Sequence, residues 1–270
     1  MIIPLKKELV LLAPIIASLF FGLLCALIIS PMQFAGVTPF PEGTGSFGNA
    51  AYFVILVGVG ATMLYVLLKR NNHKIIMLIT GFALTTAVFM LSFIYLFALL
   101  ADFDVAYLEI WILIASIAIT IAADLAIFRT HRVANLVILG IGGALGTFLG
   151  VAIPTQSTVL ILSFLAIYDM FAVYRGPVGK IAHSGLDKFR GLSFSFKDIQ
   201  MGLGDLTFYS MLAGHMFLAF GPAACLAAMG GILAGCLLSF RMLEKRGMFP
   251  GLPLPIFLGL AAGFLVAFVG

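Results

Sequence analysis

Residues 157–175 read STVLILSFLAIYDMFAVYR, a mostly apolar run that holds one acidic residue, Asp169. A helix of about 20 such residues is long enough to cross the hydrocarbon core of a bilayer. The whole chain has the same character, because 63% of its 270 residues are hydrophobic and 10% are charged. Soluble domains carry about 25% charged residues. This composition therefore argues against a soluble protein and predicts one whose main solvent is lipid.

Nine runs are long and apolar enough to be spans, namely 9–30, 48–68, 74–100, 105–127, 133–153, 157–175, 200–220, 222–240 and 251–269. We therefore expect an all-α polytopic membrane protein with nine transmembrane helices, forming a single membrane domain over residues 1–270. Helices one to six would occupy about 9–175, a cytoplasmic loop about 176–199, and helices seven to nine about 200–269. The first run follows Lys6 and Lys7, and we interpret it as a retained helix rather than a cleaved signal peptide.

The charged residues between the runs predict the orientation of the chain. All 15 lysine and arginine residues fall before the first run or in the connections that follow the second, fourth, sixth and eighth runs. The other connections carry only the acidic residues Glu42, Asp102, Asp104 and Glu109. Basic residues favour cytoplasmic loops. We therefore predict a multi-pass protein of the cell membrane with a cytoplasmic N-terminus and a C-terminus outside.

Three acidic residues fall inside the predicted spans: Asp124, Asp169 and Asp205. An ionisable group in hydrocarbon is costly and is a functional hypothesis by default. Asp124 lies five residues before Arg129, near the end of its span. It can reach the interface or a local partner there, so we interpret Asp124 as structural.

Asp169 and Asp205 lie on consecutive antiparallel spans. Asp169 is six residues before Arg175, and Asp205 is eight residues after Lys197. With a helical rise of about 1.5 Å per residue, the two carboxyls would lie roughly 9 and 12 Å from the same boundary. Two neighbouring carboxyls in a low dielectric share one proton. One can then take a proton from water while the other polarises a scissile carbonyl, with no metal or other cofactor.

Short motifs surround the two aspartates. Tyr168 precedes Asp169, and Asp205 ends the sequence Gly202-Leu203-Gly204-Asp205. The two glycines remove side chains close to the carboxyl and would let a partner helix or an extended substrate backbone approach. A third element, Pro250-Gly251-Leu252-Pro253, opens the last run. Its prolines prevent a regular helix start, which leaves backbone groups that must be buried in protein or line a water-filled cavity.

Together these motifs resemble the signature of presenilins and signal peptide peptidases, which are intramembrane aspartyl proteases. The predicted orientation and the small size look most like a microbial, archaeal presenilin homologue. The resemblance implies that Asp169 and Asp205 are the catalytic dyad, that Pro250, Gly251 and Leu252 shape the active site and help to seat substrate, and that single-span membrane proteins are the substrates. Gly251 stands where the family has alanine, and a competing register over 252–255 is possible.

The segment Leu192-Ser193-Phe194-Ser195-Phe196 alternates apolar and polar residues, which predicts a strand just before the seventh span. Its edge would hold an unwound substrate segment by β-augmentation. An amphipathic interfacial loop is the alternative. The run GIGGALG at 140–146 predicts a small-residue face for helix packing.

Other classes of protein fit less well. A cation-coupled transporter or ion-conducting protein would use Asp124, Asp169 and Asp205 to bind cations, but the two halves of the chain show no repeat. Prepilin peptidases share a Gly-x-Gly-Asp aspartate but cleave at the membrane surface. No two of the four histidines have metal-ligand spacing, and we interpret His215 as a packing residue. The expected partners are the lipid bilayer and membrane substrates, without nucleic acid, and the pattern specifies no oligomeric state.

Overall fold

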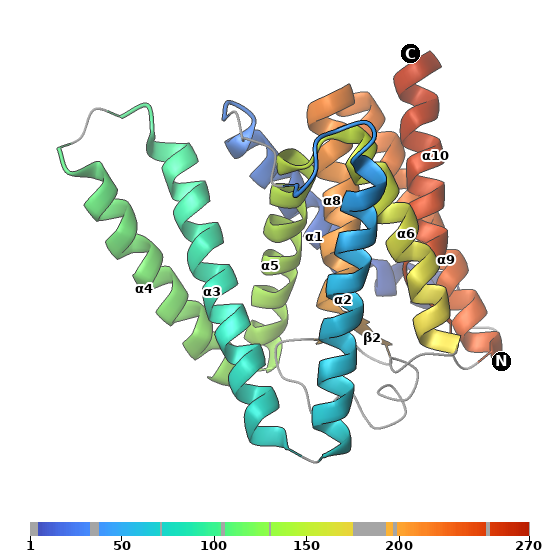
Figure 1. The fold of residues 1–270 in the computed structure, drawn as a ribbon, viewed down its shortest axis with the longest axis horizontal. Helices are drawn as coiled ribbons and strands as arrows, with labels where there is room; N and C mark the ends of the chain where they lie inside the picture. The colour runs from blue at the N-terminus through green and yellow to red at the C-terminus, as the bar shows by residue number, and fades with distance from the viewer. Residues whose placement is uncertain are drawn as a thin grey trace.

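The computed structural model describes residues 5–32, 38–70, 72–103, 106–129, 131–174, 193–196, 199–246 and 249–269. Within these ranges the chain forms nine α-helices and two β-strands (Figure 1). The helices are α1 (Leu5–Ile29), α2 (Ser46–Lys69), α3 (His73–Leu100), α4 (Leu108–Arg129), α5 (His131–Ala152), α6 (Thr155–Tyr174), α8 (Leu203–Phe220), α9 (Pro222–Arg246) and α10 (Pro253–Val269). Each helix corresponds to one predicted run, so the expected all-α polytopic fold is confirmed.

Seven of these helices, α1 to α6 and α9, are long and apolar enough to cross a membrane. The other two are shorter, with 18 residues in α8 and 17 in α10. Large apolar side chains cover the outside of the bundle, including the exposed Ile55, Leu78 and Ile114. An apolar surface of this extent is suited to lipid rather than to water. The structure is therefore that of a multi-span membrane protein, while the number of nine spans and their orientation stay predictions.

The helices alternate in direction along the bundle (Figure 1). The ends of α2, α4, α6 and α9 and the starts of α3, α5, α8 and α10 lie at one end of the bundle, the lower end in the view. Among the basic residues at this end are Lys69 and Lys74, which flank the connection from α2 to α3. Glu42 and Asp102 belong to connections at the opposite end. The arrangement agrees with the separation of basic from acidic residues seen in the sequence.

Helix α8 lies at the centre of the bundle, where it contacts α1, α5, α6, α9 and α10. Its packing against α5 depends on small residues at a spacing of four. A Cβ atom on Gly146 would collide with the Thr207 backbone oxygen, and one on Gly150 would collide with the Met211 backbone oxygen. The small-residue face of α5 therefore lets the two helices approach to backbone contact, which fixes the helix that carries Asp205.

The strand prediction is confirmed for residues 193–196. Strand β1 (Ser193–Phe196) pairs antiparallel with β2 (Ile199–Gly202), with Ser193 opposite Gly202. The remaining residues of the expected loop at 176–199 lie outside the described residues, apart from Ile199 itself.

The predicted span 200–220 began too early. Residues 199–202 form β2, and α8 begins only at Leu203. Gly202 has an extended backbone, with φ −71° and ψ 145°, and pairs with Ser193 of β1 instead of continuing the helix. The predicted depth of Asp205 counts a helical rise from Lys197, and this count is wrong because strand β2 intervenes. Apolar composition alone does not distinguish a short buried strand from the start of a helix.

Two of the other boundary differences, at α9 and α10, have a clear physical reason. Helix α9 continues to Arg246 instead of ending at residue 240, so Arg241 and Lys245 lie on its last turns. Helix α10 begins at Pro253 instead of residue 251. The first shift reflects the helix-favouring sequence RMLEKR, in which charged side chains extend an apolar helix past the hydrocarbon. The second follows from proline, which is well suited to a first helical position but not to continuing a helix.

Candidate active site

Asp169 lies in the last two turns of α6, at the end of the bundle where the hairpin and the start of α10 are also found. Its side chain is partly buried. Oδ2 of Asp169 accepts a hydrogen bond of 3.0 Å from the backbone N–H of Leu252. That N–H precedes α10 and has no partner inside the helix, so the carboxyl satisfies a group that the prolines would otherwise leave unpaired.

Asp205 lies in the first turn of α8, three residues after the N-cap Gly202. The amino end of a helix carries partial positive charge and favours a negative side chain. Gly251 lies directly against this carboxyl, because a Cβ on Gly251 would be 3.0 Å from Oδ2 and 3.3 Å from Cγ of Asp205. The absence of a side chain at Gly251 thus allows the chain before α10 to touch Asp205.

The two predicted carboxyls are therefore brought together around one dipeptide. Gly251 contacts Asp205 and Leu252 binds Asp169, and the two carboxyls are close enough to interact electrostatically. Three elements far apart in sequence, α6, α8 and the segment before α10, converge at this point. Such a pair has the chemical capacity to hold one shared proton.

Tyr209 holds the dipeptide from the other side. Its hydroxyl donates a hydrogen bond of 2.9 Å to the carbonyl oxygen of Gly251, and its ring is 1% exposed. Tyr209 is four residues after Asp205, so both side chains lie on the same face of α8. Sequence reasoning missed this residue, although the spacing of four was the signal that could have found it.

The contacts favour the register in which Pro250, Gly251 and Leu252 form the element. Pro250 and Leu252 are buried, and Pro253 begins α10. In the competing register over 252–255, Leu254 and Pro255 would be central, but both belong to the first turn of α10. Pro255 instead packs closely against Gly235 of α9.

The glycines before Asp205 border open space. Gly202 and Gly204 are exposed. Among the described side chains, a Cβ on Gly204 would meet only the Phe208 ring, at 3.8 Å. A Cβ on Gly202 would lie 3.9 Å from the Asp205 carboxyl. No described helix packs against the two glycines, so of the two roles predicted for them, approach of an extended backbone fits better than helix packing.

Two other predicted residues turn away from the carboxyls. Leu203 packs toward α5, where its side chain would lie 3.5 Å from a Cβ on Gly142. The Tyr168 hydroxyl would lie 3.4 Å from a Cβ on Gly58, so it lies beside α2. Both residues position helices next to the site and make no described hydrogen bond to either carboxyl.

A cavity of about 100 Å³ opens beside Asp205. Its lining includes Met201, Asp205, Tyr209, Phe249 and Gly251, and α9 supplies the rest. The α9 residues are Cys236, Ser239, Phe240 and Leu243. None of the α9 residues was predicted, because α9 carries no acidic group or motif within its apolar run.

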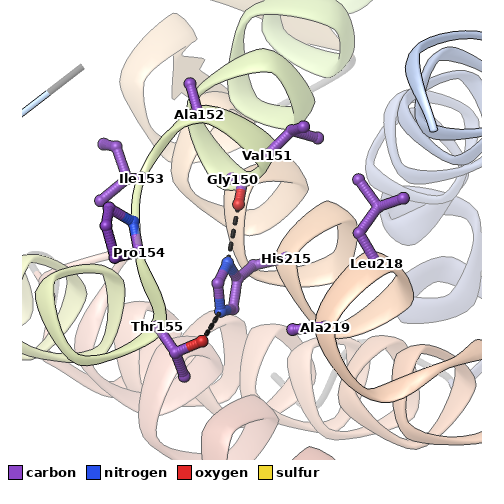
Figure 2. A pocket seen from close by; sticks show the side chains of 9 residues that line it. All are labelled: Gly150, Val151, Ala152, Ile153, Pro154, Thr155, His215, Leu218 and Ala219. Atoms are coloured by element: carbon purple, nitrogen blue, oxygen red, sulfur yellow. Dashed lines mark hydrogen bonds between the residues drawn. The ribbon is translucent and has the colours of Figure 1, made fainter. Parts of the chain in front are cut away.

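Asp124 and His215 lie apart from this site. Oδ2 of Asp124 accepts a 2.8 Å hydrogen bond from the Thr85 hydroxyl of α3, which agrees with the structural interpretation. His215 is at the other end of α8 and joins Gly150 and Thr155, through Nδ1 at 2.7 Å and Nε2 at 3.1 Å. Figure 2 shows this ring between the end of α5 and the start of α6, beside a pocket of about 340 Å³. The described residues contain no cluster of three metal-ligating side chains.

Comparison with known proteins places the chain in a family. The sequence matches the family described as signal-peptide peptidase, presenilin aspartyl protease, over residues 16–182. The match covers more than half of the chain and includes Tyr168 and Asp169. The chain therefore belongs to the signal-peptide peptidase and presenilin aspartyl protease family, and the resemblance inferred from the motifs is confirmed.

The fold is also similar to solved structures. One is a presenilin family intramembrane aspartate protease in the C222 space group, with a TM-score of 0.69 and 22% identity, covering 96% of this chain and 99% of that chain. Another is a presenilin family intramembrane aspartate protease in the P2 space group, with a TM-score of 0.67 and 20% identity, covering 99% of this chain and 98% of that chain. No curated protein sequence matches the chain.

Proposed function

We propose that this protein is an intramembrane aspartyl endopeptidase of the Gly-x-Gly-Asp type, in which Asp169 and Asp205 form the catalytic dyad. The observation that carries the proposal is the convergence of both carboxyls on Gly251 and Leu252. Family membership supports the class of reaction. The convergence supports the assignment of these two aspartates, because no other pair of acidic side chains among the described residues shares such a contact.

In the proposed reaction one carboxyl is protonated and the other is ionised. The ionised carboxylate takes a proton from water as the water oxygen adds to the scissile carbonyl carbon. The protonated carboxyl donates its hydrogen bond to the carbonyl oxygen and then its proton, which gives a neutral tetrahedral diol. Collapse of the diol breaks the C–N bond, and a proton passes to the leaving amine. The products are one new carboxyl and one new amine, and no metal or cofactor takes part.

The proposed substrates are single-span membrane proteins. A substrate helix hides its amide bonds, so the scissile segment must unwind before water can attack. The open space beside Gly202 and Gly204 suits an extended backbone. The β1–β2 hairpin ends at Gly202 and offers a strand edge to that segment, which supports β-augmentation as the way the unwound substrate is held.

For the chain as a whole, we propose nine spans in one membrane domain over residues 1–270 in the cell membrane, with the N-terminus in the cytoplasm. The support is the separation of basic from acidic connections between the two ends of the bundle. The carboxyl pair lies at the basic end, so water is proposed to reach it from the cytoplasm. Cysteine labelling of residues flanking Asp205 from one side of the membrane tests this orientation.

The test of the proposed function is cleavage of single-span reporters by the purified protein in lipid vesicles, with products identified by mass spectrometry. Asp169→Asn and Asp205→Asn are compared with Asp124→Asn, a matched control that alters a membrane aspartate outside the site. We expect cuts inside the span by the wild type and the control, and none by the two dyad variants. Cuts only outside the span, or equal activity in all four proteins, would refute the proposal. Absence of cleavage combined with cation flux that depends on Asp169 and Asp205 would establish the transporter reading instead.

A further inference from the structure

The cavity beside Asp205 has one hydroxyl on its α9 side, that of Ser239, which takes no part in the proposed reaction as described above. Its α9 residues Cys236, Ser239, Phe240 and Leu243 are spaced at i, i+3, i+4 and i+7, so they form one face of the helix. Opposite this face are the Asp205 carboxyl and the Tyr209 hydroxyl. Three oxygen-bearing side chains therefore line about 100 Å³ of space next to one aspartate of the pair.

Ser239 is an unusual serine for this chain. It is 6% exposed, and its hydroxyl has no hydrogen-bond partner among the residues that the structure describes. Serine and threonine inside a helix commonly satisfy the hydroxyl by bonding to the carbonyl four residues earlier. Other helical hydroxyls of this protein do so: Thr62, Thr80, Ser116, Thr120 and Thr207. The Ser239 hydroxyl is thus left available to something inside the cavity.

Water fits this space better than an apolar side chain does. A water molecule occupies about 30 Å³ in the liquid and needs two to four polar partners. The volume admits a small cluster, and the Asp205 carboxyl and the Ser239 hydroxyl supply two polar partners. The Tyr209 hydroxyl donates to Gly251 and interacts with the Cys236 thiol, so its hydrogen bonds are met within the protein. Substrate spans are rich in apolar side chains, which would leave the buried Ser239 hydroxyl unsatisfied.

We propose that this cavity binds the water consumed in peptide hydrolysis, and that Ser239 is a positioning residue that orders this water beside Asp205. The proposal rests on the proposed function, because it names the source of the attacking water for the same dyad. Ser239 acts through the bound water and touches neither substrate nor the scissile bond. The site stays hydrated inside an apolar bundle because its polar groups would otherwise be unpaired.

The kinetic test compares Ser239→Ala, which removes the hydroxyl, with Ser239→Thr, which retains it. The matched control is Ser210→Ala, since Ser210 is the other buried serine without a described partner and does not line the cavity. We expect Ser239→Ala to lower kcat about tenfold, as loss of one hydrogen bond to the attacking water would, with KM unchanged. Ser239→Thr and Ser210→Ala should keep kcat within about threefold of the wild type. A fall in kcat equal in both serine-to-alanine variants, or a rise in KM alone, would overturn the positioning role, and the rise in KM would make the cavity a substrate pocket.

A second test does not depend on activity. Cys236 lines the cavity, whereas Cys225 and Cys25 are buried elsewhere, with exposures of 1%, 0% and 4% respectively. Infrared spectroscopy of the thiol S–H stretch in heavy water, assigned with single cysteine-to-alanine variants, follows exchange at each thiol. We expect Cys236 to exchange first, and Ser239→Val, which fills the cavity, to slow it. Equal exchange at all three thiols would refute the hydrated cavity even if the enzyme cleaves reporters. Failure of the wild type to cleave any reporter would instead refute the proposed function and, with it, the role of this water in hydrolysis. Faster exchange at Cys236 would in that case still show that the cavity is hydrated.

Discussion

The backbone N–H of Leu252 and the carboxyl of Asp169 are separated by 83 positions in the chain and joined by a hydrogen bond of 3.0 Å. The neighbouring residue, Gly251, lies against the other carboxyl, that of Asp205. The segment before α10 therefore sets the positions of both acids relative to each other. A change in that segment is expected to alter catalysis without removing any acidic group.

Substitutions of Gly251 should show a steep dependence on size. A Cβ at this position would be 3.0 Å from Oδ2 of Asp205, so Gly251→Ala requires a shift of a few tenths of an ångström by a flexible carboxyl. The resembling family carries alanine here, and we expect Gly251→Ala to retain cleavage within about tenfold. Gly251→Leu would displace Asp205 altogether and should abolish cleavage. Reporter cleavage rates of the folded variants check this, and equal activity of the leucine variant would contradict the contact.

Tyr209→Phe tests whether Tyr209 positions the Gly251–Leu252 dipeptide without taking part in the reaction itself. The substitution removes the 2.9 Å hydrogen bond to the Gly251 carbonyl and leaves that oxygen without its described partner. We expect the free energy of unfolding to fall by about 1–2 kcal/mol and kcat to fall severalfold, with the substrate cut at the same bond. Thermal unfolding in detergent and cleavage kinetics measure the two effects. An unchanged kcat would show that Tyr209 does not hold the dipeptide in its active position.

Adjacent glycines in α9 provide a matched pair for testing how α10 is held. A Cβ on Gly231 would collide with the Leu258 backbone oxygen, whereas one on Gly230 meets nothing within 4 Å among the described residues. Gly231→Ala should destabilise the protein by about 1–3 kcal/mol, because α10 must move away from α9. It should also lower cleavage, since α10 starts directly after Leu252.

Gly230→Ala serves as the control for that substitution. It should stabilise α9 by about 0.5–1 kcal/mol through helix propensity, with cleavage unchanged. Unfolding midpoints and cleavage rates of the two variants, measured side by side, distinguish packing from propensity. Equal effects of the two alanines would show that contact between α9 and α10 does not position the site.

His215 is expected to matter for stability alone. The Gly150 carbonyl can only accept, so Nδ1 carries the proton and the neutral ring accepts at Nε2 from the Thr155 hydroxyl. His215→Ala removes both bonds that tie α8 to α5 and α6, and should lower the free energy of unfolding by about 2–4 kcal/mol. The kcat of the folded fraction should not change. A loss of kcat that exceeds the loss of folded protein would contradict this assignment.

The apolar helices could be predicted from the sequence, and the two aspartates could be singled out, because both are strong signals. A run of apolar residues and an acid inside it are local and costly to place elsewhere. The predicted start of α8 was wrong because Ile199 and Met201 are as compatible with a strand as with a helix. Pairing with β1 makes this segment a strand. The local preference of a residue for helix or strand does not indicate whether a partner strand lies beside it.

The rest of the site depends on contacts between distant segments. Tyr209 carries a weak signal, its spacing of four from Asp205, whereas Ser239 carries none. The proposed role of Ser239 depends on the place where its face of α9 meets α8. That place is set by glycine contacts and by the position of α10. Leu203 shows the reverse case, since it belongs to the motif but packs against α5. Motif membership and contact with the site are therefore different properties.

In the proposed mechanism Asp169 and Asp205 act as one unit. The most direct measurement is the cleavage rate of a single-span reporter by Asp169→Asn, Asp205→Asn and the double variant, each confirmed as folded. Residues that act together are not additive, so each single variant should lose at least about a hundredfold, and the double variant should lose no more than either. Losses that multiply in the double variant, or a single variant that cleaves at the wild-type rate, would contradict the account.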